Sequence, residues 1–203
     1  MKKTVICNIP MMKNVDKCIY SSEDSALKSA NKAVLYPINA FLANSLTEND
    51  EVKDLLLIKR TGAYQENTAS FIEELSQINK GIGAKIEHEL IETDFVEEKR
   101  VHEQLMGRIV EEIDNNSHII ADITYGPKDL PIVLFAALNF VERFLDCEIE
   151  NIIYGQAKFE DGKPVDTKLC DMTSLYYLNS VTNTMNCDDY DKARKMLRTL
   201  LSM

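Results

Sequence analysis

Residues 124–129 read Thr-Tyr-Gly-Pro-Lys-Asp and could form a phosphate-binding turn. A β-branched run at 118–122 comes before them and an apolar stretch at 130–144 follows, so the sequence predicts a strand, a tight turn and a helix. The first N–H groups of a helix have no partner within it, and they lie at the positive end of the helix dipole. The predicted turn therefore favours an anion such as phosphate.

The side chains of this turn can each contribute to binding. Gly126 lets the backbone approach a ligand closely, and Lys128 offers a positive charge to phosphate. Thr124 and Tyr125 supply hydroxyl groups, and either Asp129 or Thr124 could cap the helix. The residue types alone also fit an ordinary connecting turn in which Lys128 is only solvated.

Several other chemistries lack the residues that they need. No G-x-G-x-x-G motif and no Walker A lysine loop follows the first predicted strand, and Gly81 and Gly83 are expected only to end a helix. His88, His102 and His118 stand in unrelated segments, where solvated or structural roles are expected. The arginine–histidine spacing of HEPN ribonucleases is also missing.

The sequence predicts no metal site. The five cysteines form no C-x-x-C pair, which argues against structural zinc and against a disulfide framework. Asp94, Glu97 and Lys99 have the residue types of a metal-dependent nuclease, but they crowd the start of one predicted helix. Asp166 and Lys168 have the same types on one short strand. Reduced cysteines are typical of a cytoplasmic protein.

The composition and net charge of the chain narrow the class of protein further. The chain has 203 residues, of which 45% are hydrophobic and 28% charged, and this suits one soluble domain with at most a short appendage. Its net charge of −10 argues against binding duplex nucleic acid, although a local nest of amides beside a lysine can still hold a small anion. No run approaches the ~18 apolar residues of a membrane-spanning helix.

Hydrophobic periodicity predicts strands that alternate with helices. One long helix is expected to start near residues 21–24, to run through Leu42 and to bend at Pro37. Asp161 and Gly162 predict a type I′ hairpin turn. The other expected strands are 3–8, 54–59, 85–91 (at a sheet edge), 118–122, 150–158 and 165–171, and the other expected helices are 66–78, 95–115, 130–144, 173–185 and 188–202.

These elements predict an α/β fold: a Rossmann-like, mostly parallel sheet flanked by helices, with an antiparallel C-terminal hairpin and two terminal helices. Ligands of such sheets bind beyond the carboxyl ends of the strands. The turns at 8–13, 60–64 and 124–129 are expected to converge there.

Part of the sequence resembles a known family. Residues 122–131 read D-I-T-Y-G-P-K-D-L-P, and they are followed by Ala-Ala-Leu-Asn-Phe at 136–140 and Ile-Tyr-Gly at 153–155. This resembles the CARF domain of type III CRISPR-associated proteins, whose pattern is roughly D-x-T-H-G-x-R-S-x-P. The resemblance covers residues 1–171 and leaves 172–203 as a helical appendage. Tyr125, Lys128 and Asp129 replace the usual histidine, arginine and serine.

The resemblance implies a homodimer that binds cyclic oligoadenylate, usually cyclic tetra-adenylate, across its two-fold axis, without a cofactor. A symmetric ring on a symmetric interface lets each subunit supply the same contacts twice. The residues implied to bind the ligand are Asn8, Ile9, Pro10, Arg60, Thr61, Gly62, Thr124, Tyr125, Gly126, Lys128 and Asp129.

Two activities follow from the resemblance, and one alternative lies outside it. The domain could be a sensor, either alone or joined to an effector, since the residues after the last strand are too few for a nuclease domain. It could also be a metal-independent ring nuclease, with Lys128 and Thr124 as catalytic residues. The alternative is a small-nucleotide-binding, Rossmann-like regulator unrelated to CRISPR.

Overall fold

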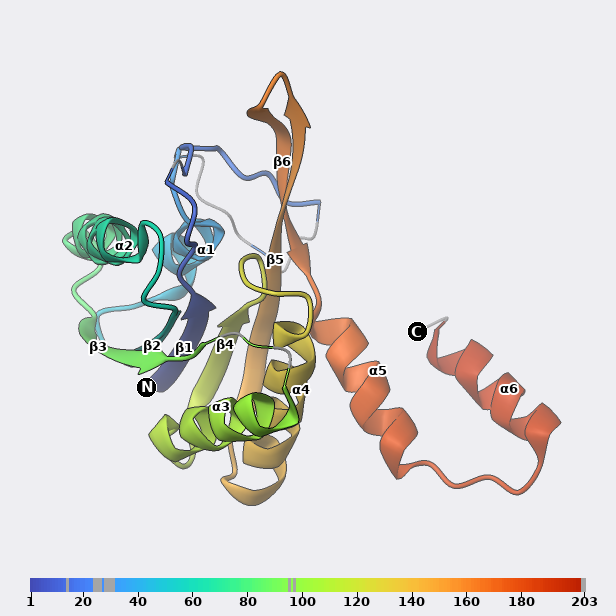
Figure 1. The fold of residues 1–203 in the computed structure, drawn as a ribbon. Helices are drawn as coiled ribbons and strands as arrows, with labels where there is room; N and C mark the ends of the chain where they lie inside the picture. Colours follow the sequence, from blue (N-terminus) through green and yellow to red (C-terminus); the bar gives the residue numbers. More distant parts are fainter. Residues whose placement is uncertain (14, 24–26, 28–31, 95, 97, 202–203) are drawn as a thin grey trace.

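A computed structural model describes residues 1–13, 15–23, 27, 32–94, 96 and 98–201. A six-stranded sheet lies between two layers of helices, with α1 and α2 on one face and α3 and α4 on the other (Figure 1). The strands are β1 Lys2–Asn8, β2 Glu51–Ile58, β3 Lys85–Glu92, β4 His118–Asp122, β5 Glu148–Glu160 and β6 Lys163–Asp171. The helices are α1 Pro37–Ser45, α2 Tyr64–Asn79, α3 Lys99–Glu112, α4 Leu130–Phe144, α5 Thr173–Thr184 and α6 Tyr190–Leu200.

The strand order is β3-β2-β1-β4-β5-β6, and every pair is parallel except β5 with β6. The predicted α/β fold is therefore confirmed. The central strands are apolar on both sides because each face carries a helix layer. In β1, Val5 and Cys7 face α1 and α2, whereas Ile6 faces α3 and α4. β3 lies at the edge of the sheet, as its alternating pattern predicted.

The predicted long helix ending at Leu42 is wrong over the part of it that the structure describes. α1 starts at Pro37, which fixes the φ angle of the first helical turn and lacks the N–H that would be unpaired there. Tyr36 before it is extended, as residues before proline prefer. Residues 24–26 and 28–31 lie outside the described chain.

Before α1, the structure shows isolated bridges of strand type at Cys18, Ser21 and Val34 and no helix among the described residues. Cys18 and Val34 exchange two N–H···O bonds of 2.9 Å, and Ser21 pairs with Thr167 and Leu169 of β6. The chain after β1 therefore crosses the carboxyl edge of the sheet to reach the far strand (Figure 1). These partners are distant in sequence, so helical periodicity gave the wrong answer.

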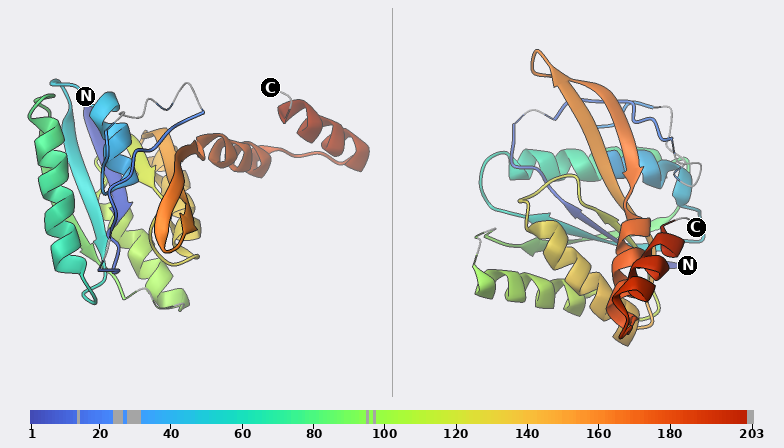
Figure 2. Two further views of the ribbon diagram at one scale, coloured as in Figure 1. Left: turned by 90° about the horizontal axis from the view of Figure 1, so that it is seen from above. Right: turned by 90° about the vertical axis from the view of Figure 1, so that its right-hand side faces the viewer.

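The other elements agree with the sequence apart from their ends. α3 starts at Lys99 and not at Phe95; residues 95 and 97 are outside the described chain. Asp161 and Gly162 have φ angles of 49° and 75°, and this confirms the predicted hairpin turn. α5 and α6 extend away from the body (Figure 2). No described helix is long and apolar enough to cross a membrane.

Candidate functional site

The three predicted turns meet at the carboxyl edge of the sheet. They follow β2, β1 and β4, which are neighbours in that order. The chain runs outward from β1 in one direction through β2 and β3, and from β4 in the other through β5 and β6. The β1–β4 boundary is thus the switch point, where open α/β sheets bind ligands.

Close contacts join the three turns. The Asn8 side chain is satisfied when its nitrogen faces the Leu57 carbonyl at 3.1 Å and its oxygen faces the Gly126 N–H at 3.2 Å. Ala63 donates its N–H to the Met11 carbonyl at 3.1 Å. The Asn67 side chain donates to the carbonyl oxygens of Pro10 and Met12 at 2.6 and 2.9 Å. Hydrogen bonds thus join the three turns into one surface at the carboxyl edge of the sheet.

The turn before α4, residues 124–129, carries polar groups that have no partner in the described part of the protein. We call this turn, together with the start of α4, the mouth of α4. Lys128 is exposed and makes no hydrogen bond or ion pair with any residue that the structure describes. The backbone N–H groups of Tyr125, Lys128 and Asp129 likewise have no acceptor among the residues that the structure describes. Gly126, between the first and the other two, has a φ of 114°, and its own N–H faces the Asn8 side-chain oxygen.

The Thr124 hydroxyl donates one hydrogen bond and accepts another within the protein. Its N–H, at 2.8 Å, and its hydroxyl both donate to Asp122 Oδ1. The hydroxyl oxygen accepts from the Gly155 N–H at 2.7 Å. Burial raises the pKa of Asp122 to about 6, although the bonds from Thr124 oppose this shift. Thr124 therefore shapes the turn and joins β4 to β5.

The same arrangement recurs on the other side of β5. Asp171 Oδ1 accepts from the N–H of Thr173, at 2.8 Å, and from its hydroxyl. The Thr173 hydroxyl oxygen accepts from the Ile152 N–H at 2.8 Å. Each Asp-x-Thr unit thus ties the end of one strand to the backbone of β5.

Thr124→Val is expected to lower the free energy of unfolding by about 2 kcal/mol, because buried Asp122 and Gly155 each lose a partner. Thr173→Val should cost a similar amount, and denaturant unfolding of both variants measures this. If Thr124 only shapes the turn, Thr124→Val should weaken ligand binding but leave the turnover of bound ligand unchanged once the variant is folded. A loss of turnover confined to Thr124→Val would instead give its hydroxyl a catalytic role.

Asp129 and Tyr125 point away from the free groups of the mouth. Asp129 does not cap α4 with its side chain; its carboxylate pairs with Nε2 of His102 on α3. Tyr125 packs against the core beside Tyr20, and burial raises its pKa. The Asp129 carboxylate is thus bonded to a histidine of α3 within the protein.

The remaining predicted residues divide into buried and accessible ones. Ile9 is fully buried, and its N–H donates to the Leu57 carbonyl. Arg60 is exposed but is paired with Glu92 at 2.8 Å. The exposed positions of the edge are Met11, Met12, Lys13, Arg60, Thr61, Gly62, Gly126 and Lys128.

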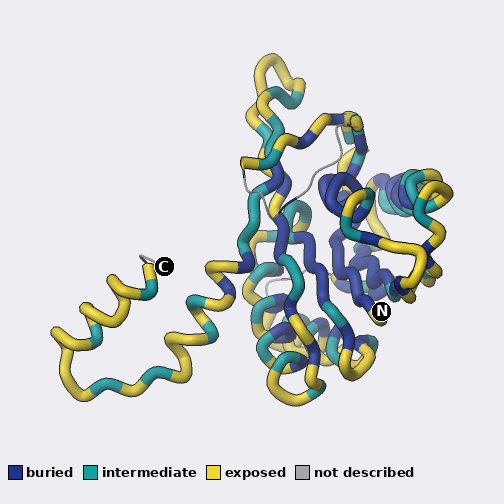
Figure 3. Tube along the Cα trace, turned by 180° about the vertical axis from the view of Figure 1, so that it is seen from behind, coloured by how far each residue is buried: buried dark blue, intermediate teal, exposed yellow. Residues whose placement is uncertain are grey.

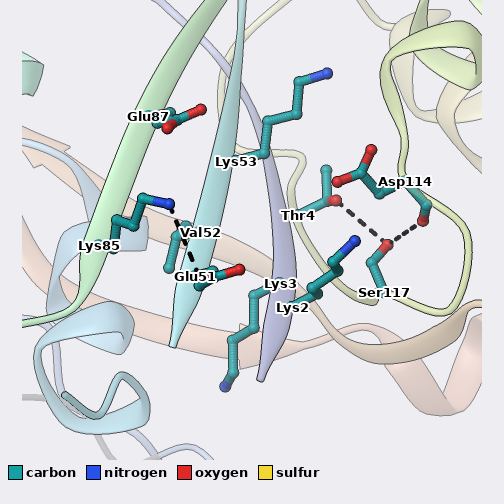
Figure 4. Close-up of a pocket in the computed structure, with 10 residues that line it drawn as sticks. All are labelled: Lys2, Lys3, Thr4, Glu51, Val52, Lys53, Lys85, Glu87, Asp114 and Ser117. Carbon is teal, nitrogen blue, oxygen red and sulfur yellow. Dashed lines mark hydrogen bonds and ion pairs between the residues drawn. The ribbon is translucent and has the colours of Figure 1, made fainter. Parts of the chain in front are cut away.

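A hollow lies at the opposite, amino edge of the sheet (Figure 4). Its lysines are mostly paired: Lys85 with Glu51, and Lys53 with Glu112 outside the view. It contains none of the residues predicted to bind the ligand. The amino edge is therefore a weaker candidate than the switch point.

Sequence reasoning missed two of the groups that organise the site. Asp122 was taken as the end of a strand and as the first residue of the family pattern but was given no role in the site, although the Asp-x-Thr spacing is typical of a side chain that bonds the backbone two residues later. No sequence signal pairs His102 with Asp129, because they lie on different helices.

No group of three or more His, Cys, Asp or Glu side chains within the described chain could hold a metal ion. No protein-family model matches the sequence, and no curated protein is significantly similar to it. What places this chain among known proteins is therefore its Rossmann-like α/β fold with a mostly parallel sheet.

Proposed function

We propose that the chain binds a cyclic oligoadenylate, cyclic tetra-adenylate first among them, across a homodimer in type III CRISPR signalling. The observation that carries the proposal is the mouth of α4, where exposed Lys128 and three unpaired N–H groups lie beside the switch point. Such groups suit the phosphates of a nucleotide. The sequence pattern at 122–131 supports this class of ligand.

The rest of the edge suits the remaining parts of such a ligand. Met11 and Met12 are 38% and 55% exposed, and they offer flexible apolar surface to a base. Lys13 adds a second exposed charge on the same loop. A two-fold dimer would present each of these groups twice to a symmetric ring.

Binding is better supported than turnover. Ring cleavage would form a bond from a ribose 2′-oxygen to the adjacent phosphorus and break the bond to the 5′-oxygen. The 2′-hydroxyl proton would pass to solvent, and the leaving 5′-oxygen would take one up. Lys128 would stabilise the charge on the phosphoryl oxygens. The Thr124 hydroxyl donates its one proton to Asp122 and accepts from Gly155, so it has no free proton to donate in this step.

Calorimetry with cyclic tri-, tetra- and hexa-adenylate is the direct test, with chromatography of products over hours in EDTA. Lys128→Ala is expected to weaken binding at least about tenfold, because the phosphates lose a free charge. Lys80→Ala removes another exposed lysine, at the far end of α2, and should bind as the wild type does. Binding of no ring would sink the proposal. Binding of mononucleotides alone would favour the non-CRISPR regulator.

A further inference from the structure

One side-chain pair joins the first turn of α3 to the start of α4. His102 of α3 bonds through Nε2 to Oδ2 of Asp129, the residue that directly precedes α4. A carboxylate only accepts hydrogen bonds, so Nε2 is the donor. The two side chains are 33% and 25% exposed, so the bond is partly shielded from water.

The packing of α3 and α4 brings these two residues together. Helical spacing places His102 on the same side of α3 as Leu105 and Ile109, which are both buried. Leu130, directly after Asp129, is buried in the same core cluster. Both helices cover one face of the sheet, whose central strands are buried (dark blue in Figure 3). The core therefore fixes where the histidine and the carboxylate meet.

The Asp129 carboxylate has no second anchor within the described chain. Its Oδ1 atom is buried and has no hydrogen-bond partner among the described residues. A capping side chain would bond the N–H of the second or third helical residue. The second is Pro131, which has no N–H, and the N–H of Ile132 is already bonded to the Asp129 carbonyl at 3.0 Å. Of the residues that the structure describes, His102 alone therefore holds this carboxylate.

The direction of the Asp129 side chain matters for an anion at the mouth of α4. The backbone N–H groups of Lys128 and of Asp129 itself are among those that have no acceptor in the described chain. The positive end of α4 attracts a carboxylate that is free to turn toward it. A carboxylate in that position would occupy the space that a phosphate needs and would repel it. The bond to His102 holds the carboxylate elsewhere.

We propose that His102 is a positioning residue for phosphate binding: it keeps the Asp129 carboxylate away from the mouth of α4 and so leaves Lys128 and the free N–H groups open to an anion. His102 acts through Asp129 and does not itself contact the ligand. This role rests on the proposed function, which supplies the phosphate. It allows the mouth to accept an anion although an acidic residue directly precedes α4.

The test is a nuclear magnetic resonance titration of the whole ¹⁵N-labelled chain with two probes, inorganic pyrophosphate and cyclic tetra-adenylate. The amide signals of Tyr125, Lys128 and Asp129 report binding at the mouth. His102→Ala should weaken the binding of both probes at least about tenfold, because the freed carboxylate repels phosphate. In the Asp129→Ala protein no carboxylate remains to be held, so the same exchange should change affinity less than about twofold.

Two further variants separate this role from a general loss of structure. His102→Gln keeps a side-chain N–H donor and should bind both probes within about threefold of the wild type. His118→Ala is the matched control, because it removes another histidine–carboxylate pair, with Glu148 at 3.5 Å, at the amino end of β4. This control should bind as the wild type does. A histidine that only stabilised the packing of α3 on α4 would be needed in the Asp129→Ala protein as well.

The outcomes separate the role of His102 from the proposed ligand. Unchanged binding by His102→Ala, a loss that persists in the Asp129→Ala protein, or an equal loss in His102→Gln or His118→Ala would overturn that role and leave the ligand in place. A wild type that binds pyrophosphate but no ring, with the loss confined to His102→Ala, would keep the role and remove the ligand. A wild type that binds neither probe would overturn both.

Discussion

Replacing Gly62 with alanine is expected to lower the free energy of unfolding by about 4 kcal/mol, the sum of a backbone and a packing cost. Gly62 has a φ of 64°, which side chains other than hydrogen disfavour. A Cβ atom there would lie 2.4 Å from the Met11 carbonyl oxygen, and the backbone at Met11 would have to move. The bond from Ala63 to that carbonyl would be lost with it. Chemical denaturation measures the change.

Gly107→Ala is the matched control for this variant. Gly107 lies inside α3, and a Cβ atom there would meet nothing within 4 Å. The same exchange should therefore stabilise the protein by about 1 kcal/mol, because alanine favours a helix over glycine. Equal effects of the two exchanges would contradict the close approach of Gly62 and Met11. Since that contact joins two of the turns, folded Gly62→Ala should also bind its ligand more weakly.

Local pattern was enough to predict most of the scaffold. The β-branched run of β1 indicated a strand, the continuous apolar run of β2 indicated a strand buried on both faces, and the alternation in β3 indicated an edge. Pro131 at the first turn fixed the start of α4, so its predicted bounds match the structure. The meeting of the three turns followed from the rule that parallel strands end at one edge.

What the pattern could not predict depends on partners far along the chain. Ser21 is paired with β6, about 146 residues away, and is not part of a helix, and no local signal in the sequence reports this pairing. Of the residues at 27–42 that the structure describes, only those from Pro37 onward form a helix. Asp129 was expected near the ligand or as a cap, but a histidine on α3 takes its carboxylate. The individual side-chain roles of the site therefore needed the structure.

Asp122→Asn is expected to change how stability depends on pH. Burial raises the Asp122 pKa from 3.8 to about 6, so the folded state holds this proton more tightly than the unfolded chain does. Protonated Asp122 therefore stabilises the wild type most below about pH 4. The free energy of unfolding of the wild type falls by about 3 kcal/mol as the pH rises to about 7 and Asp122 ionises. An amide cannot ionise, and the variant escapes that loss.

The test is the difference in free energy of unfolding between Asp122→Asn and the wild type, measured by denaturation at several pH values. That difference should rise in favour of the variant by about 3 kcal/mol from about pH 4 to 7, whatever constant offset the amide adds. Burial also raises the Asp54 pKa, but both proteins share that group, so it cancels. A flat difference would mean that Asp122 is not held as a buried acid.

Thr124→Val supplies a second check, because the Thr124 hydroxyl lowers the Asp122 pKa by bonding to its carboxylate. Without that bond the pKa of Asp122 should rise further, and the fall in stability should move to higher pH. The turn that presents Lys128 is thus held by an acid that is partly protonated near pH 6. If phosphate binding depends on that turn, affinity should change over the same pH range in the wild type and stay level in Asp122→Asn.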